Sequence, residues 1–295
     1  MTVLLIGHGY WGKKIATTLH QFKNLQLFIY DQAENKSSLD DFLTAIPNFD
    51  HVIIATPEQT HYFLTKKFLL LNKDVFVEKP LCLEEKQAQE LVDLAMKNKL
   101  KLFVDYIFLY DNFAAKIKEL LDSQLIGKLI KISTLRFSSF INKPDLIVSD
   151  DLMIHDLYLL RYFFKSKVFE VSFVSSSPTS NSAFEQAKFF LILADKLKVE
   201  ASYSWFSPES KREYKFIGEN GTIVWKKNEF SEELVLFDKK AQKTILVENK
   251  QSPLYKSIAT FFSEAADSNK IYNNYIEDSR ILALARTSFY ENKSL

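Results

Sequence analysis

Three glycines stand in one short turn near the start of the chain, in the order Gly7-x-Gly9-x-x-Gly12. An apolar run, Val3 to Ile6, precedes the turn, and a stretch with helical spacing follows it. In such a turn the first glycine permits the tight bend, the second lets a phosphate approach the backbone, and the third lets the helix pack close to the strand. The pattern predicts a dinucleotide-binding unit in a doubly wound parallel sheet.

An acidic residue follows the next predicted strand at the expected distance. Asp31 ends the apolar run Leu25 to Tyr30 and lies 31 − 12 = 19 residues beyond Gly12. A carboxylate there accepts hydrogen bonds from ribose hydroxyls and repels a 2′-phosphate, so NAD is favoured over NADP. The alternative interpretation is that Asp31 is only a turn or helix-capping residue.

Composition limits the class of protein. The chain has 295 residues, 47% apolar and 25% charged, which indicates an ordinary globular protein with two domains. A formal charge of +1 gives no electrostatic support for binding nucleic acid or an acidic membrane. Cys82 is the single cysteine, which excludes a disulfide framework. With no apolar run of about 18 residues, we expect a cytoplasmic protein without a membrane span.

The order of predicted elements changes along the chain. Strands and helices alternate in the first part, which predicts a Rossmann domain over residues 1–108. Consecutive strands then predict a second α/β domain, 109–295, with a large, mostly antiparallel open sheet. Its expected strands cover 128–138, 168–174, 188–193, 197–205, 213–217, 222–226, 233–237 and 243–247, and its expected helices cover 151–164, 254–266 and 277–290.

Two candidate motifs lie at the ends of predicted parallel strands, where open α/β sheets bind ligands. The first is Thr56-Pro57 with His61; its alternative is a turn and helix cap with a surface histidine. The second is Glu78-Lys79-Pro80, in which the proline presents Lys79 from a rigid turn. A lysine beside a carboxylate is also common as a simple surface ion pair.

The third candidate is Asp151-x-x-x-His155 on a predicted helix. Residues four apart share a helix face, and a carboxylate there can orient an imidazole. Such a histidine can act as general base toward an alcohol proton. The alternatives are an exposed helix pair and a metal site, the latter thinly supported by one histidine and its neighbouring aspartates.

Taken in order, the glycine turn, the Thr56 and Lys79 motifs and the Asp151/His155 pair resemble the Gfo/Idh/MocA oxidoreductases. The resemblance implies hydride transfer between NAD and a secondary alcohol carbon of a sugar, nucleotide sugar or polyol. It implies catalytic roles for Lys79, Asp151 and His155, with Tyr106 joining them in substrate binding, and no metal. The implied cofactor-binding residues are Gly7, Gly9, Tyr10, Trp11, Gly12, Asp31, Thr56, Pro57, His61, Glu78 and Lys79.

The segment before Asp151 departs from the family pattern. Many members have a glycine-rich stretch there, whereas this chain has Asp145 to Asp150, and Asp150 stands where a tryptophan is frequent. The extra negative charge leaves the substrate open. Two other functions remain as alternatives: an NADP-dependent reductase of a keto-sugar or C=N bond, and a non-catalytic NAD-binding scaffold or sensor. By the same resemblance, we expect a homodimer or homotetramer formed through the second sheet.

Overall fold

A computed structural model describes residues 1–139, 147–176, 186–194, 196–238, 241–248, 250–263 and 268–291. The chain forms two compact units, each built from two stretches of sequence. The first contains Met1–Ile107 and Gln251–Arg280, and the second contains Phe108–Lys250 and Ile281–Leu295. Within the described ranges, no helix has both the length and the apolar character that crossing a bilayer requires.

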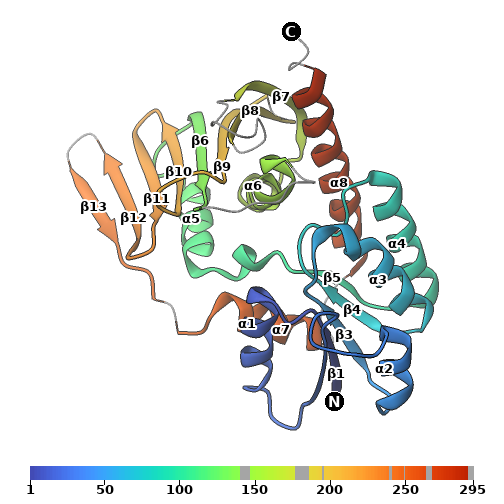
Figure 1. The fold of residues 1–295 in the computed structure, drawn as a ribbon. Helices are drawn as coiled ribbons and strands as arrows, with labels where there is room; N and C mark the ends of the chain where they lie inside the picture. Colours follow the sequence, from blue (N-terminus) through green and yellow to red (C-terminus); the bar gives the residue numbers. More distant parts are fainter. Residues whose placement is uncertain are drawn as a thin grey trace. The chain divides into compact units, whose positions relative to one another are not determined.

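The first unit holds a five-stranded parallel sheet in the order β2-β1-β3-β4-β5 (Figure 1). Its strands are β1 (Thr2–Ile6), β2 (Gln26–Tyr30), β3 (His51–Ile54), β4 (Asp74–Val77) and β5 (Leu102–Val104). Strands β1, β3, β4 and β5 are apolar runs that are mostly buried, whereas the edge strand β2 is only partly buried. The strand order reverses between β1 and β3. The predicted doubly wound sheet is confirmed, and its ligand-binding edge lies at the carboxyl ends of these strands.

Helices cover both faces of this sheet. They are α1 (Tyr10–Leu19), α2 (Leu39–Ala45), α3 (Glu58–Leu70), α4 (Glu85–Asn98), α7 (Pro253–Phe262) and the first part of α8 (Ser268–Glu291). Helix α1 packs with α7, and α3 packs with α4; Figure 1 shows the two pairs on opposite sides of the sheet. The stacked rings of Phe22 and Tyr255, with centroids 4.8 Å apart, link the segment after α1 to α7.

The compact units differ from the sequence-based division at residue 108 in one respect. Residues 251–280 pack with the first unit, although the prediction assigned them to the second domain. The physical reason is aromatic packing: the Phe261 ring lies 5.6 Å from Phe76 and 5.9 Å from Phe103, both on the parallel sheet. Tyr272 adds a hydrogen bond of 2.9 Å from its hydroxyl to the Leu100 carbonyl.

The second unit holds an eight-stranded sheet in the order β13-β12-β11-β10-β6-β9-β8-β7. Its strands are β6 (Leu129–Phe137), β7 (Val168–Ser176), β8 (Gln186–Leu193), β9 (Lys198–Ser204), β10 (Lys211–Gly218), β11 (Gly221–Lys227), β12 (Glu232–Asp238) and β13 (Gln242–Ile245). Among the described strand pairs of this second sheet, only β6–β9 is parallel, so the predicted mostly antiparallel sheet is confirmed.

One long helix, α6 (Val148–Phe164), packs against β8 and β9 of this sheet (Figure 1). Nearly all its side chains are buried, so it forms the centre of the unit's core. It begins three residues before the predicted Asp151. A shorter helix, α5 (Asn112–Asp122), was not predicted; Asp111 caps it by accepting the Phe113 N–H at 2.9 Å.

Candidate active site

The glycine turn in the first unit has the shape that a dinucleotide needs. Gly7 has a φ of +93°, and a Cβ there would lie 2.4 Å from the Ala55 carbonyl oxygen. A Cβ on Gly12 would lie 2.1 Å from the Gly7 carbonyl oxygen. By contrast, a Cβ on Gly9 would meet no protein atom within 4 Å. Packing therefore requires Gly7 and Gly12, whereas Gly9 leaves open space at the start of α1, where a pyrophosphate fits.

Asp31 is tied to this turn. Its Oδ2 accepts the His8 N–H at 2.6 Å, and its Oδ1 accepts the Ala33 N–H at 2.9 Å. The hydrogen bond from the His8 backbone is the main reason why the pKa of Asp31 is lowered. The carboxylate thus stabilises the turn, as the alternative interpretation held. Because an ionised carboxylate accepts about four hydrogen bonds, it also has capacity for ribose hydroxyls.

Glu78 connects the glycine turn to the segment that carries Lys79. The Trp11 indole N–H donates a hydrogen bond to Glu78 Oε1. Glu78 follows β4 directly, and its backbone N–H donates to the Ile54 carbonyl at 2.9 Å. The bond from α1 to the end of β4 places the Lys79 segment beside the expected cofactor turn.

Asp105, at the end of the neighbouring strand β5, forms a carboxyl pair with Glu78. Its Oδ1 accepts a hydrogen bond from the Ser257 hydroxyl at 2.6 Å. Its Oδ2 is buried and accepts no hydrogen bond from an N–H or alcohol group of the described residues. Burial raises the pKa of Asp105 to about 6. Burial and the Asp105 charge raise the pKa of Glu78 well above its usual range, against the opposing charge of Lys79. One proton on Glu78 can satisfy Asp105 Oδ2, so we interpret the two carboxyls as sharing it.

His61 joins the two strand-end segments from within the core. It is only 1% exposed, with Nδ1 at 2.7 Å from the Pro80 carbonyl and Nε2 at 2.9 Å from the Thr56 carbonyl. Burial lowers its pKa. His61 is therefore not a surface residue. The geometry supports a role in positioning the backbone at Thr56 and Pro80, and its predicted contact with the cofactor stays a prediction.

The two candidate tyrosines of the first unit lie in different environments. Tyr10 is 78% exposed beside Gly9, and its hydroxyl accepts a hydrogen bond from Lys14 Nζ at 2.8 Å. Tyr106 is only 5% exposed, and its hydroxyl donates to Asp278 Oδ2 at 2.6 Å. This bond ties the end of β5 to α8, and substrate contact by Tyr106 stays a prediction.

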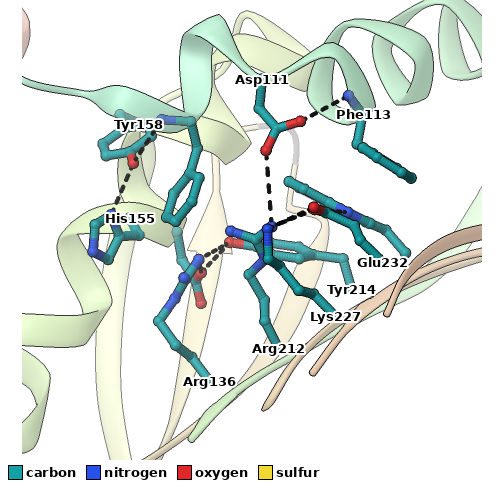
Figure 2. Close-up of polar contacts among 12 residues, drawn as sticks. Asp111, Phe113, Arg136, His155, Tyr158, Arg212, Tyr214, Lys227 and Glu232 are labelled. Carbon is teal, nitrogen blue, oxygen red and sulfur yellow. Dashed lines mark hydrogen bonds and ion pairs between the residues drawn. The ribbon is translucent and has the colours of Figure 1, made fainter. Parts of the chain in front are cut away.

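Asp151 and His155 lie on α6 in the second unit, and both are buried rather than exposed. Asp151 Oδ2 accepts the Trp205 indole N–H at 3.2 Å. His155 Nδ1 lies 2.8 Å from the Tyr158 hydroxyl, which also accepts the Phe108 N–H at 3.4 Å (Figure 2). In the tautomer that carries its proton on Nδ1, His155 donates to the Tyr158 hydroxyl, and Nε2 is the basic atom.

The unusual acid before Asp151 is neutralised within the second unit. Asp150 is 1% exposed, and its Oδ1 lies 3.1 Å from Arg286 Nη2. Its Oδ2 accepts the Ile147 N–H at 3.1 Å, which stabilises the start of α6. The expected extra negative charge is thus paired with a cation. Asp145 and Leu146, from the same segment, lie outside the described residues.

Sequence reasoning missed a group of buried polar residues beside His155. Asp156, the next residue on α6, is fully buried and lies 3.4 Å from Arg136 Nη2. It accepts hydrogen bonds from the hydroxyls of Thr134 at 2.6 Å, Tyr203 at 2.9 Å and Tyr214. The available signal was Arg136 itself, a charged residue at an inward position of an alternating strand.

A cavity of about 270 Å³ opens beside His155 within the second unit. The residues that line it come from α6, the sheet and the segment before α5, and they include Phe108, Arg136, Leu152, His155, Arg212 and Lys227. A cavity with a histidine and several cations in its wall is suited to a polar small molecule.

Comparison with known proteins places the chain in a family. The description "Oxidoreductase family, NAD-binding Rossmann fold" matches residues 1–106, and "GFO/IDH/MocA C-terminal domain" matches residues 114–224. The chain belongs to the Gfo/Idh/MocA oxidoreductases. The predicted family and fold class are thereby confirmed.

Curated relatives match only part of their length. The inositol 2-dehydrogenase of Rhizobium meliloti is 25% identical over 41% of this chain and 38% of that protein. The myo-inositol 2-dehydrogenase of Thermotoga maritima is 30% identical over 42% of this chain and 39% of that protein. The matched stretches thus span under half the length of these relatives.

Solved structures share the fold over nearly the full chain. The UDP-N-acetylglucosamine 3-dehydrogenase of Acidithiobacillus ferrooxidans is 21% identical, covers 98% of this chain and 96% of its own, and has a TM-score of 0.77. The biliverdin reductase of Synechocystis, solved with biliverdin and NADP⁺, is 18% identical, covers 97% of this chain and 98% of its own, and has a TM-score of 0.79.

Proposed function

We propose that this family member is an NAD-dependent dehydrogenase of a secondary alcohol carbon in a sugar, nucleotide sugar or polyol. The observation that carries the proposal is the hydrogen bond from Trp11 to Glu78, which links the glycine turn to Lys79. A cation beside a cofactor turn is suited to binding the oxygen at a carbon that loses hydride. Relatives named inositol dehydrogenases support the substrate class.

The residues around the turn favour NAD. The open backbone at Gly9 would receive the pyrophosphate, and Asp31 would accept the ribose hydroxyls. The ionised Asp31 carboxylate would repel the 2′-phosphate of NADP. When bound there, NAD supplies the hydride acceptor.

The protein's own residues would manage the proton. Lys79 would hydrogen-bond the reacting oxygen, and His155 Nε2 would take the hydroxyl proton. Tyr158 would hold the imidazole in the required tautomer through Nδ1. Asp151, which Trp205 holds, would orient the substrate or His155.

The test combines two substitutions with a matched control. In Lys79→Ala and His155→Ala, NADH formation with an active polyol or nucleotide sugar should fall about 10²- to 10⁴-fold, since the first removes the hydrogen bond to the reacting oxygen and the second removes the base. In His155→Ala, which alters a residue outside the implied cofactor-binding set, NAD affinity measured by calorimetry should stay within about twofold. Lys97→Ala, which changes an exposed lysine on α4, should leave both quantities unchanged.

Three results would overturn the proposal. Unchanged turnover in both variants would remove Lys79 and His155 from the chemistry. A clear preference for NADPH would favour reduction of a keto-sugar or C=N bond. Binding of NAD without reduction by any member of a wide polyol and nucleotide-sugar panel would favour a scaffold or sensor.

Assembly is a separate part of the proposal. An open antiparallel sheet has a face that needs covering, so we expect the eight-stranded sheet to form the interface of a homodimer or homotetramer. Light scattering of the intact chain tests this expectation, and a monomer at working concentrations would contradict it.

A further inference from the structure

Three cations form a row across the second sheet. Arg136 on β6 is paired directly with Arg212 on β10, and Arg212 is paired with Lys227 on β11. Both arginines are only 6% exposed, at inward positions of their strands. Like charges directly opposite each other destabilise a sheet, and burial, followed by the charge of Arg136, lowers the pKa of Arg212. Asp156 pairs with Arg136, and Glu232 pairs with both Arg212 and Lys227, which offsets part of this cost within the protein.

Both guanidinium groups keep donors that the described residues do not use. Nη2 of Arg136 bonds Tyr214 at 2.7 Å and Asp156 at 3.4 Å. Nη2 of Arg212 bonds Glu232 at 2.8 Å. Nε of each arginine is buried without a partner in the described part of the chain, whereas the hydrogen bonds to Tyr214, Asp156 and Glu232 all come from Nη2. A buried donor without a protein partner calls for an acceptor from outside the chain, such as a water molecule, an ion or a ligand.

The cavity wall is cationic where these groups face it. Four cations line the cavity, Arg136, Lys211, Arg212 and Lys227, against the single carboxylate of Glu229. The carboxylates that pair with the arginines are not among the lining residues. A small oxyanion in the cavity would therefore meet positive charge directly.

Aromatic rings hold this cationic wall next to the candidate base. The Arg212 guanidinium lies 4.2 Å from the Phe108 ring centre and 4.2 Å from the Trp225 ring centre. The Phe108 ring also lies 5.1 Å from the Arg136 guanidinium and, between ring centres, 4.9 Å from His155. Figure 2 shows Arg136 and Arg212 rising side by side from the sheet toward the level of His155. One phenyl ring thus separates the arginines from the imidazole.

From this arrangement we propose that the substrate carries an oxyanion group, a carboxylate or a phosphate, and that Arg136 and Arg212 bind it beside His155. The inference rests on the proposed function and narrows its substrate to acidic or phosphorylated sugars and nucleotide sugars. Arginine presents several fixed N–H donors, which match the oxygens of either group.

Calorimetry with the intact protein tests the proposal without turnover. The probes are glucuronate for a carboxylate, glucose 6-phosphate for a phosphate monoester, UDP for a diphosphate, and glucose as the neutral control. At least one anionic probe should bind more tightly than glucose. Arg212→Gln should weaken its binding about ten- to a hundredfold, because charged hydrogen bonds are lost. The control is Lys226→Gln, which alters a half-exposed residue next to Lys227 that is paired with Glu233. It should leave the affinity for the probe unchanged.

Each result of these titrations either supports the proposed oxyanion site or overturns it. The probe with the largest loss in Arg212→Gln identifies the oxyanion's source. Equal binding of anions and glucose, or an Arg212→Gln variant that binds the anion as the parent does, overturns the proposal. If Arg212→Gln does not fold, Lys227→Gln replaces it, with a smaller expected loss of about three- to tenfold. Because only binding is measured, a failure of NADH formation would count against the proposed function and not against the anion site.

Discussion

Tyr158 lies one helical turn after His155, with its hydroxyl 2.8 Å from Nδ1 of the imidazole. The same hydroxyl accepts the Phe108 N–H, so its orientation is set by the backbone at the start of the second unit. The candidate base is thus held by a tyrosine on its own helix.

Tyr158→Phe should lower kcat about five- to tenfold, because it removes one hydrogen bond that sets the imidazole tautomer. KM and NAD affinity should change little, while the pH at which kcat falls should move, since the proton on His155 loses its partner. Tyr162→Phe on the same helix is the control. A kcat loss with an unchanged pH profile would indicate that Tyr158 is only structural.

Gly9 and Gly12 should respond differently to alanine. Gly9→Ala should fold with an unchanged Tm, because its Cβ enters open space, yet bind NAD about tenfold more weakly by blocking the phosphate. Gly12→Ala should lose about 2 kcal/mol or more of unfolding free energy, since its Cβ meets the Gly7 carbonyl. Thermal melts and NAD titrations separate the two effects. Equal NAD affinity in Gly9→Ala and the parent would move the pyrophosphate away from this turn.

Asp31→Asn should reduce the preference for NAD over NADP. The amide keeps a hydrogen-bond acceptor toward the turn but loses the charge that repels a 2′-phosphate. We expect the ratio of NAD to NADP affinity to fall about tenfold. Asp40→Asn, at an exposed residue paired with Lys67, is the control. If the ratio stays constant, Asp31 serves the turn alone.

Asp105→Asn should change how stability depends on pH. The folded chain holds a proton at Asp105 up to about pH 6, against 3.8 for an ordinary aspartate. Folding is therefore favoured by this group below about pH 4, and the contribution is lost as pH rises through about 6. The variant lacks this loss, so its unfolding free energy relative to the parent should rise by about 3 kcal/mol across that window.

Urea unfolding at a series of pH values provides the measurement for Asp105→Asn. The amide oxygen can still accept the Ser257 hydroxyl, so the substitution preserves the contact with α7. Asp93→Asn, on the exposed side of α4, should show no such trend. A parent and variant that differ by a constant amount at every pH would refute the raised pKa of Asp105.

The amino-acid sequence was sufficient to determine the features that depend on residues close together in the chain. The bend at Gly7 and the close packing at Gly12 depend on backbone sterics within one turn. Helix α6 and its Asp151/His155 pair follow from helical spacing, and the strands of both sheets follow from apolar runs and alternation. These features identified the family and the candidate catalytic residues.

Tertiary structure alone decided which distant residues meet. The register between β6 and β10 puts Arg136 opposite Arg212, and the return of the chain through α7 brings Ser257 to Asp105 and Phe261 to the parallel sheet. The pairing of Asp150 with Arg286 arises in the same way. Periodicity specifies which face of an element is buried, but partners are chosen by packing and strand register between segments far apart in the chain. The cofactor turn is thus local in origin, whereas the cationic cavity beside His155 exists only in the folded protein.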